Sequence, residues 1–217
     1  MKVKWLGHSC FLLTSESGLR IITDPYTPGV YGLEYAPPAE TADIVTMSHD
    51  HADHNNVAAV KGNPQVVRGV GSHEARGIQF KGIATAHDES SGKERGANTI
   101  FCFALDGINV CHLGDVGHDL SGETVAAIGE VDVLLIPVGG NFTIDAALAN
   151  RLCQKLAPKV VIPMHFKTAR CPSFPVTGVE DFTRGRQQVK TIDGSEVELK
   201  KGQLPATTET IVLKPAL

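Results

Sequence analysis

The chain of 217 residues carries 20 lysines and arginines against 24 acidic residues, for a net charge of −4, and 42% of its residues are hydrophobic. These values predict one globular domain over residues 1–217, and they argue against nucleic acid as the main partner. No apolar run approaches the roughly 20 residues of a membrane span, and the N-terminus lacks the apolar stretch of a signal peptide. Because the five cysteines are scattered without a C-x-x-C pair, we expect reduced thiols and a cytoplasmic protein.

The first sixty residues predict an antiparallel meander followed by irregular chain. Three strands are expected, over residues 3–6, 10–14 and 19–23. Glycines, prolines and three tyrosines predict a loop over 26–38. A further apolar run, Ile44–Met47, predicts a strand, and residues 52–60 predict a short helix.

The rest of the chain predicts more strands and one long helix. Strands are expected over residues 65–68, 78–85, 99–105, 108–113, 131–137 and 160–164. The Asp-Gly pair at 106–107 is a strong hairpin signal, and the continuous apolar run 131–137 is typical of a strand buried on both faces. Helical spacing of apolar residues predicts a helix over 143–156 with Thr143 as its N-cap. The tail, 196–200 and 210–214, predicts a closing pair of strands.

The sequence His-Asp-His-Ala-Asp-His runs from His49 to His54, directly after the predicted strand 44–47. Neutral imidazole and carboxylate are both suitable ligands for zinc, manganese and iron. His49 and His51 point the same way in an extended turn and can share one ion, whereas Asp53 and His54 fall on the following bend and can reach a second. The alternative, a solvated polar loop, is disfavoured by three imidazoles and a carboxylate within six residues.

Three further candidate ligands also come at the carboxyl ends of predicted strands. They are His87, Asp115 and His165. Strand ends of one sheet lie side by side, so separated segments can converge on one site. Each residue alone would more often be a hydrogen-bonded turn or surface residue, but together with the first motif they predict a metal centre.

The ordered ligand set resembles that of the metallo-β-lactamase superfamily, and the resemblance covers nearly the whole chain. It implies an α+β fold, a four-layer αββα sandwich in which two mixed sheets face each other. It also implies two divalent metal ions, zinc before manganese or iron. In this family pattern, one ion takes His49, His51 and His87, the other takes Asp53, His54 and His165, and Asp115 bridges the two.

Within the superfamily, the chain is most similar to ascorbate-6-phosphate lactonase and related metal-dependent hydrolases. The supporting motifs are Trp5–Ser9, Thr23–Pro25, His112–Asp115, Pro137–Thr143 and Pro163–Thr168. These motifs do not identify a substrate.

Two such ions lower the pKa of a bridging water to about 7 and supply hydroxide at neutral pH. We therefore predict a hydrolase of a small ester, lactone or phosphoester, in which Asp53 orients the nucleophile or passes its proton to the leaving group. His8, in a Gly-His-Ser bend, is a second candidate catalytic residue, and a backbone-bonded turn residue is its alternative. Asp24 could accept a hydrogen bond from a ligand histidine or simply form an Asp-Pro turn.

The remaining polar residues give weaker signals. His112 is expected to be structural, Cys111 to be a small buried residue, and His118 could reach the substrate. Basic residues after two ligand-bearing strands could attract a small anionic substrate, and simple solvation is their alternative. These residues are Lys93, Arg95, Lys167 and Arg170.

Two other functions stay open at this point. A di-iron redox protein on the same fold would use the same ligands, although no flavodoxin-like segment is fused here. A non-catalytic metal-binding protein would have an idle site, although all seven ligand positions are filled. The sequence does not fix the oligomeric state, and a homo-oligomer is compatible with it.

Overall fold

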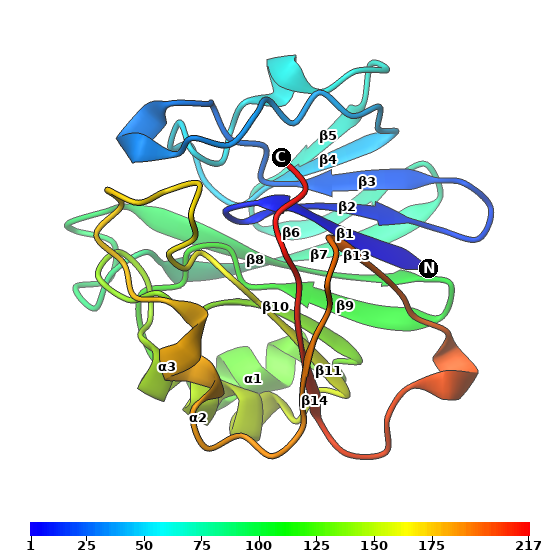
Figure 1. Ribbon diagram of the computed structural model, residues 1–217. Helices are drawn as coiled ribbons and strands as arrows, with labels where there is room; N and C mark the ends of the chain where they lie inside the picture. Colours follow the sequence, from blue (N-terminus) through cyan, green and yellow to red (C-terminus); the bar gives the residue numbers. More distant parts are fainter.

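The computed structural model describes residues 1–217 and contains two β-sheets that face each other (Figure 1). The smaller sheet has the strand order β13 (Glu196–Glu198), β1 (Lys2–Gly7), β2 (Cys10–Thr14), β3 (Arg20–Thr23), β4 (Ile44–Met47) and β5 (Gln65–Arg68). The larger sheet has the order β12 (Val189–Thr191), β14 (Glu209–Val212), β11 (Val160–Met164), β10 (Val133–Pro137), β9 (Ile108–His112), β8 (Ala97–Leu105), β7 (Ile78–Ala86) and β6 (Gly71–Ala75). Both sheets mix parallel and antiparallel pairs.

The three α-helices lie together on the outer side of the larger sheet (Figure 1). They are α1 (Gly122–Ile128), α2 (Ala146–Leu156) and α3 (Val179–Thr183). Beyond the smaller sheet, the chain forms loops and the short 3₁₀ helices η1 (Val30–Gly32) and η2 (Val57–Ala59), and a third, η3 (Lys201–Gln203), precedes β14. The two mixed sheets with few helices confirm the predicted α+β sandwich. None of the helices has the length and apolar character needed to cross a membrane.

The middle strands of the smaller sheet, β2, β3 and β4, are buried on both faces. Along β2 and β3, Phe11 and Ile21 belong to the main core, which also includes the inner residues of the larger sheet. Their neighbours Leu12 and Ile22 belong to a second apolar cluster. Because successive side chains of a strand point to opposite faces, both sets of residues must be apolar, which accounts for the unbroken apolar runs in the sequence.

Two local predictions are wrong. Residues 52–60 form turns and η2 in place of the predicted helix, because Asn55 and Asn56 donate side-chain hydrogen bonds to the carbonyls of Asp50 (2.8 Å) and Tyr26 (3.1 Å). Side chains that bond the backbone in this way compete with helix formation. Helix α2 begins after Asp145, whose carboxylate accepts a hydrogen bond from the Leu148 N–H (2.8 Å), so Thr143 is not its N-cap.

The tail forms both predicted strands, but they do not pair with each other. β13 joins β1 in the smaller sheet, whereas β14 lies between β11 and β12 in the larger one. The tail therefore links the edge strand of the smaller sheet to the second strand of the larger one. The elements α1, α3, β6 and β12 were not predicted from the sequence.

The topology brings several strand ends to one edge of the sandwich. β9, β10 and β11 are parallel, and β3 is parallel to β4. β7 and β9 are both antiparallel to β8, so β7 ends on the same side as β9. All candidate ligands follow strands that end at this edge.

Candidate metal centre

The structure brings all seven predicted ligand side chains into one cluster. Ring nitrogens of His49, His51 and His87 lie within 4.8 Å of one another. A second group with the same spread combines ligand atoms of His8, Asp53, His54 and His165. The predicted division into two triads thus has a geometric counterpart, with His8 added to the second group.

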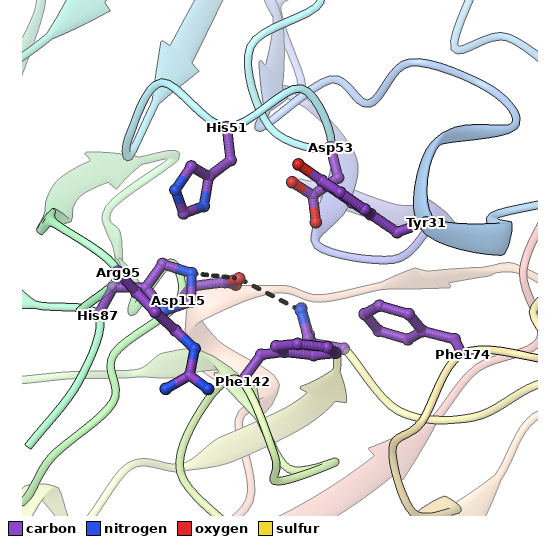
Figure 2. Close-up of a pocket in the computed structure, with 9 residues that line it drawn as sticks. Tyr31, His51, Asp53, His87, Arg95, Asp115, Phe142 and Phe174 are labelled. Carbon is purple, nitrogen blue, oxygen red and sulfur yellow. Dashed lines mark ion pairs between the residues drawn. The ribbon is translucent and has the colours of Figure 1, made fainter.

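Asp115 lies between the two groups (Figure 2). Its Oδ2 atom is 3.1 Å from Nε2 of His54 and 3.2 Å from Nε2 of both His87 and His165. The Nε2 atoms of His54 and His165 nevertheless have no hydrogen-bond partner, since the angles are unsuitable. Polar atoms that converge without hydrogen-bond geometry are what a set of metal ligands presents around an ion.

Other buried polar atoms of the cluster also lack a partner. They are Nε2 of His49, Oδ1 of Asp53 and Nδ1 of His87 and His165. An unpaired buried polar group costs about 1–3 kcal/mol. Five imidazoles and two carboxylates are a donor set suited to zinc, manganese or iron, so these residues fit a pair of such ions. Their assignment as ligands stays a prediction.

The carboxylates and imidazoles of the cluster set one another's charge. Burial disfavours protonation of His54 and His87, but Asp115 raises the pKa of both, so these two imidazoles would give up a proton when a cation binds. Burial lowers the pKa of His49 to about 3, so its imidazole is neutral and free to act as a ligand at neutral pH. Burial would raise the pKa of Asp115, but the nearby His165 and His54 hold it well below its usual range. Burial would likewise raise the pKa of Asp53, which His54 lowers. Both carboxylates are therefore ionised.

His8 lies in the bend between β1 and β2. Its Nε2 atom is 3.1 Å from Oδ2 of Asp53, and burial together with His165 lowers the pKa of His8 to about 4. The imidazole is therefore neutral at neutral pH and can donate one N–H to Asp53. The His8 carbonyl also accepts hydrogen bonds from Trp5 Nε1 (3.0 Å) and the His165 N–H (3.2 Å). His8 thus combines a backbone-bonded turn with a side chain inside the ligand cluster.

Three residues at the centre adopt left-handed backbone conformations. The φ angles are 52° for His8, 38° for Asp24 and 52° for His165. Residues other than glycine rarely adopt such angles, and strained residues of this kind concentrate at functional sites.

Asp24 fixes the orientation of a candidate ligand. It follows β3, is fully buried, and its Oδ1 atom accepts a hydrogen bond from the Ser48 N–H (2.8 Å). Its Oδ2 atom is 2.9 Å from Nδ1 of His54, whose Nε2 atom then faces Asp115. Such a partner on the other ring nitrogen is usual for a histidine that binds metal.

We expect Asp24→Ala to weaken metal binding by about 10–100-fold, as the loss of an outer partner of a ligand usually does. It should also cost about 1–3 kcal/mol of stability, because buried donors of Ser48 and His54 lose their acceptor. Chelator competition and denaturant unfolding measure the two effects.

Asp43→Ala is the matched control. Asp43 accepts a backbone hydrogen bond from Arg20 (2.9 Å) in the same sheet but contacts no candidate ligand. It should lower stability alone, and unchanged metal affinity in Asp24→Ala would contradict the role of Asp24.

Sequence reasoning missed the residue that positions Asp115. The Asn98 side chain on β8 donates to the Leu113 carbonyl (2.9 Å) and accepts from the Asp115 N–H (3.0 Å). Gly114 packs so tightly against Asn98 and Ser48 that a Cβ atom there would clash with both. A lone asparagine within a strand carries no sequence signal for such a role.

Several weaker predictions can be compared with the structure. His118, which could have reached the substrate, accepts a hydrogen bond from the Ala86 N–H (3.2 Å) and lines a cavity separate from the one above the candidate ligands. His112 is structural, as expected, because its ring bonds the Ser9 carbonyl (3.0 Å). Cys111 is buried, as expected.

A cavity of about 210 Å³ opens above the ligands (Figure 2). Of the four basic residues considered from the sequence, Arg95 alone lines it. Lys93, Lys167 and Arg170 lie outside its walls. The cavity is lined by Tyr31, His51, Asp53, His87, Arg95, Asp115, Phe142, His165 and Phe174.

Residues 2–165 match the model of the family described as the β-lactamase superfamily domain. This chain belongs to the metallo-β-lactamase superfamily. Membership of this superfamily, which the order of the candidate ligands along the chain predicts, is therefore confirmed.

Relatives within the superfamily cover most of the chain. A UPF0173 metal-dependent hydrolase from Carboxydothermus hydrogenoformans is 31% identical, over 77% of this chain and 85% of the relative. Another, from Archaeoglobus fulgidus, is 30% identical over 94% of this chain and 97% of the relative. The solved structure of a superfamily protein from Thermotoga maritima is 38% identical, with a TM-score of 0.81, and covers 98% of this chain and 97% of that one.

Proposed function

We propose that this superfamily member is a hydrolase that uses two divalent metal ions to cleave a small ester, lactone or phosphoester. The position of Asp115 carries the proposal, because one carboxylate oxygen lies 3.1–3.2 Å from imidazoles of both ligand groups. The names of the relatives, which are metal-dependent hydrolases, support it. Zinc is the ion we expect first, with manganese or iron as alternatives for the same ligands.

When bound, two divalent cations would supply an activated water near neutral pH and polarise the substrate oxygen. Asp53 lines the cavity, and its Oδ1 atom has no partner within the protein. This oxygen can orient the attacking water and later return a proton to the leaving oxygen. The N–H of His8 holds the other oxygen of Asp53 and so fixes the carboxylate for both tasks.

A substrate screen tests the proposal. Phosphodiesters, phosphomonoesters, lactones and thioesters are offered to the protein with zinc and with manganese supplied separately. Turnover of one class that disappears on chelation and returns with metal is the expected result. A protein that carries two ions per chain but hydrolyses none of these classes would contradict the proposal.

The same preparations separate the alternatives. Iron in the purified protein together with a near-ultraviolet absorption band would favour a di-iron redox protein. Absence of any metal after reconstitution would favour an idle site. Zinc or manganese without such a band is expected for the hydrolase.

We expect His8→Asn to lower turnover by about tenfold or more, because Asp53 loses the donor that orients it. Asparagine tolerates the left-handed backbone that His8 adopts, so the fold should persist. Metal content and melting temperature should stay near those of the wild type. A loss of metal would instead make His8 a ligand, and an unchanged rate would leave it a turn residue.

A further inference from the structure

The cavity above the ligands has a polar floor and aromatic walls. Phe142 and Phe174 stack with ring centroids 5.2 Å apart, and Phe174 also packs on the ring of His165 (5.4 Å). Tyr31 lies on another wall with 62% of its surface exposed and a φ angle of 50°. Aromatic side chains that line a cavity suit an apolar, planar ligand group, and the strained backbone of Tyr31 is of the kind found at functional sites.

Arg95 is the cationic wall of this cavity. Its guanidinium lies 5.7 Å from the ring centroid of Phe142 and donates no hydrogen bond within the protein. The nearest carboxylate is that of Glu94, only at 4.0 Å. The guanidinium therefore keeps its planar set of donors available for an anion.

The carboxylate of Asp88 holds the loop that carries Arg95. Oδ2 of the buried Asp88 accepts the backbone N–H groups of Glu94 (3.0 Å) and Arg95 (2.8 Å), and its Oδ1 accepts those of Ser90 and Gly92 (both 2.8 Å). These four hydrogen bonds fix the loop between the ligand His87 and Arg95. The backbone that carries Arg95 is thus preorganised beside the cavity, which lowers the entropy cost of binding.

We propose that this cavity selects a small substrate with an anionic group bound by Arg95 and an apolar, planar part that lies against Phe142, Phe174 and Tyr31. The charge balance favours this choice, because the carboxylates of Asp24, Asp53 and Asp115 offset three of the four positive charges of two divalent ions. The kind of bond that is cut rests on the proposed function. The binding of the anionic and apolar groups in the cavity can be tested without turnover.

The test uses three probes that separate charge from ring and are poor metal ligands. They are benzenesulfonate, methanesulfonate and the neutral methyl phenyl sulfone. Ligand-observed NMR titrations are run on the zinc-saturated protein, with metal content measured in every sample. Benzenesulfonate should bind about tenfold more tightly than either other probe, as expected for one charge-assisted contact and one buried ring.

Three variants test which residues bind the charge and which bind the ring of benzenesulfonate. Arg95→Met should abolish the preference for benzenesulfonate over the sulfone, whereas Lys93→Met, on the same loop but outside the cavity, should keep it. Phe142→Leu should reduce the preference over methanesulfonate. Metal content should equal that of the wild type in all three variants.

Two results overturn the inference: no measurable benzenesulfonate binding, or equal affinities in the wild type and Arg95→Met. If the probes bind as expected but no ester is hydrolysed, the proposed function fails and the binding assignment stands. If esters are hydrolysed and Arg95→Met leaves probe binding unchanged, the proposed function stands and the binding assignment fails.

A second inference concerns Cys102 and Cys111, which face each other across β8 and β9 with Sγ atoms 3.7 Å apart. The two-residue turn at Asp106 and Gly107 has φ angles of 52° and 72°, as in a type I′ hairpin. Counting from its closing pair, Leu105 and Ile108, places the cysteines at a non-hydrogen-bonded position. At such positions Cα atoms lie about 4.5 Å apart, within the range of a disulfide.

One thiol of the pair is accessible, and the other is buried against it. Cys102 is half-buried, and both cysteines line a surface cavity with Ile128, Glu130 and Val131. The contact with the Cys111 sulfur and the neighbouring Lys81 lower the pKa of Cys102, although burial opposes this shift, and a lower pKa favours the thiolate. We propose that this pair is a reversible disulfide site. A peroxide oxidises Cys102 to a sulfenic acid with release of one water, and the Cys111 thiol then displaces a second water to form the S–S bond.

Treatment with hydrogen peroxide should reduce the free thiols from five to three, and dithiothreitol should restore them. Mass spectrometry should show the loss of two hydrogens and a peptide linked through these two cysteines. Cys102→Ser should abolish the change, and Cys153→Ser, at a buried and separate cysteine, should not. Stable oxygen adducts on Cys102 without the linked peptide would overturn this assignment.

Discussion

Replacing Asp115 with alanine should remove metal and turnover together. Its Oδ2 atom is the shared contact of imidazoles from both ligand groups, so its loss leaves two cations close together without an anion between them. Loss of an outer partner already costs about 10–100-fold in affinity, so loss of this carboxylate should cost more than about a hundredfold. Elemental analysis and turnover, measured on the same sample, give both quantities.

Asp119→Ala is the matched control. Asp119 lies on the same connection but is exposed and pairs with Lys155 at the surface. It should change neither metal content nor rate. Full turnover in Asp115→Ala would show that this strand end has been assigned wrongly.

His165→Ala should act on one of the two sites. His165 belongs to the ligand group that includes Asp53 and His54. It is not a member of the other group, which consists of His49, His51 and His87. We therefore expect the variant to retain about one ion per chain, and loss of both ions or of neither would contradict the division into two groups.

Removal of both ions should produce the second large effect, a loss of stability. Each ion that binds only the folded state adds about 4 kcal/mol when its free concentration is a thousand times its Kd. For a chain of this size, each kcal/mol shifts the melting temperature by about 2–4 °C. Chelation should therefore lower the melting temperature by roughly 10 °C or more.

Calorimetry with and without chelator measures this shift, and readdition of zinc should reverse it. Asp115→Ala should show little further change on chelation, since it has lost its ions already. A melting temperature that stays constant after the ions have been removed would contradict a metal centre that is linked to folding.

The candidate ligands were predictable because their residue types and their places after strands are local features of the sequence. His87, Asp115 and His165 each follow a buried strand, and the sheet topology brings those strand ends together. The pattern predicts that these residues converge, whereas their division into two ligand groups is what the resemblance to the superfamily implies.

Residues that act through a distant contact were not predictable. Asn98 bonds a residue seventeen positions away, and the sequence does not distinguish Arg95, which lines the cavity, from Lys93, which does not. Tyr31 lies in a stretch whose sequence predicts only a loop. The predicted helix at 52–60 failed because hydrogen bonds from asparagine side chains to the backbone outweigh helical propensity.

The number of metal ions per chain tests the central claim most directly. The protein is stripped with chelator, reconstituted with zinc, freed of excess metal and measured by elemental analysis together with protein concentration and turnover. The two ligand groups and the shared Asp115 predict close to two ions per chain, with activity that follows the second ion. At most one ion per chain with full activity would contradict the two-metal centre.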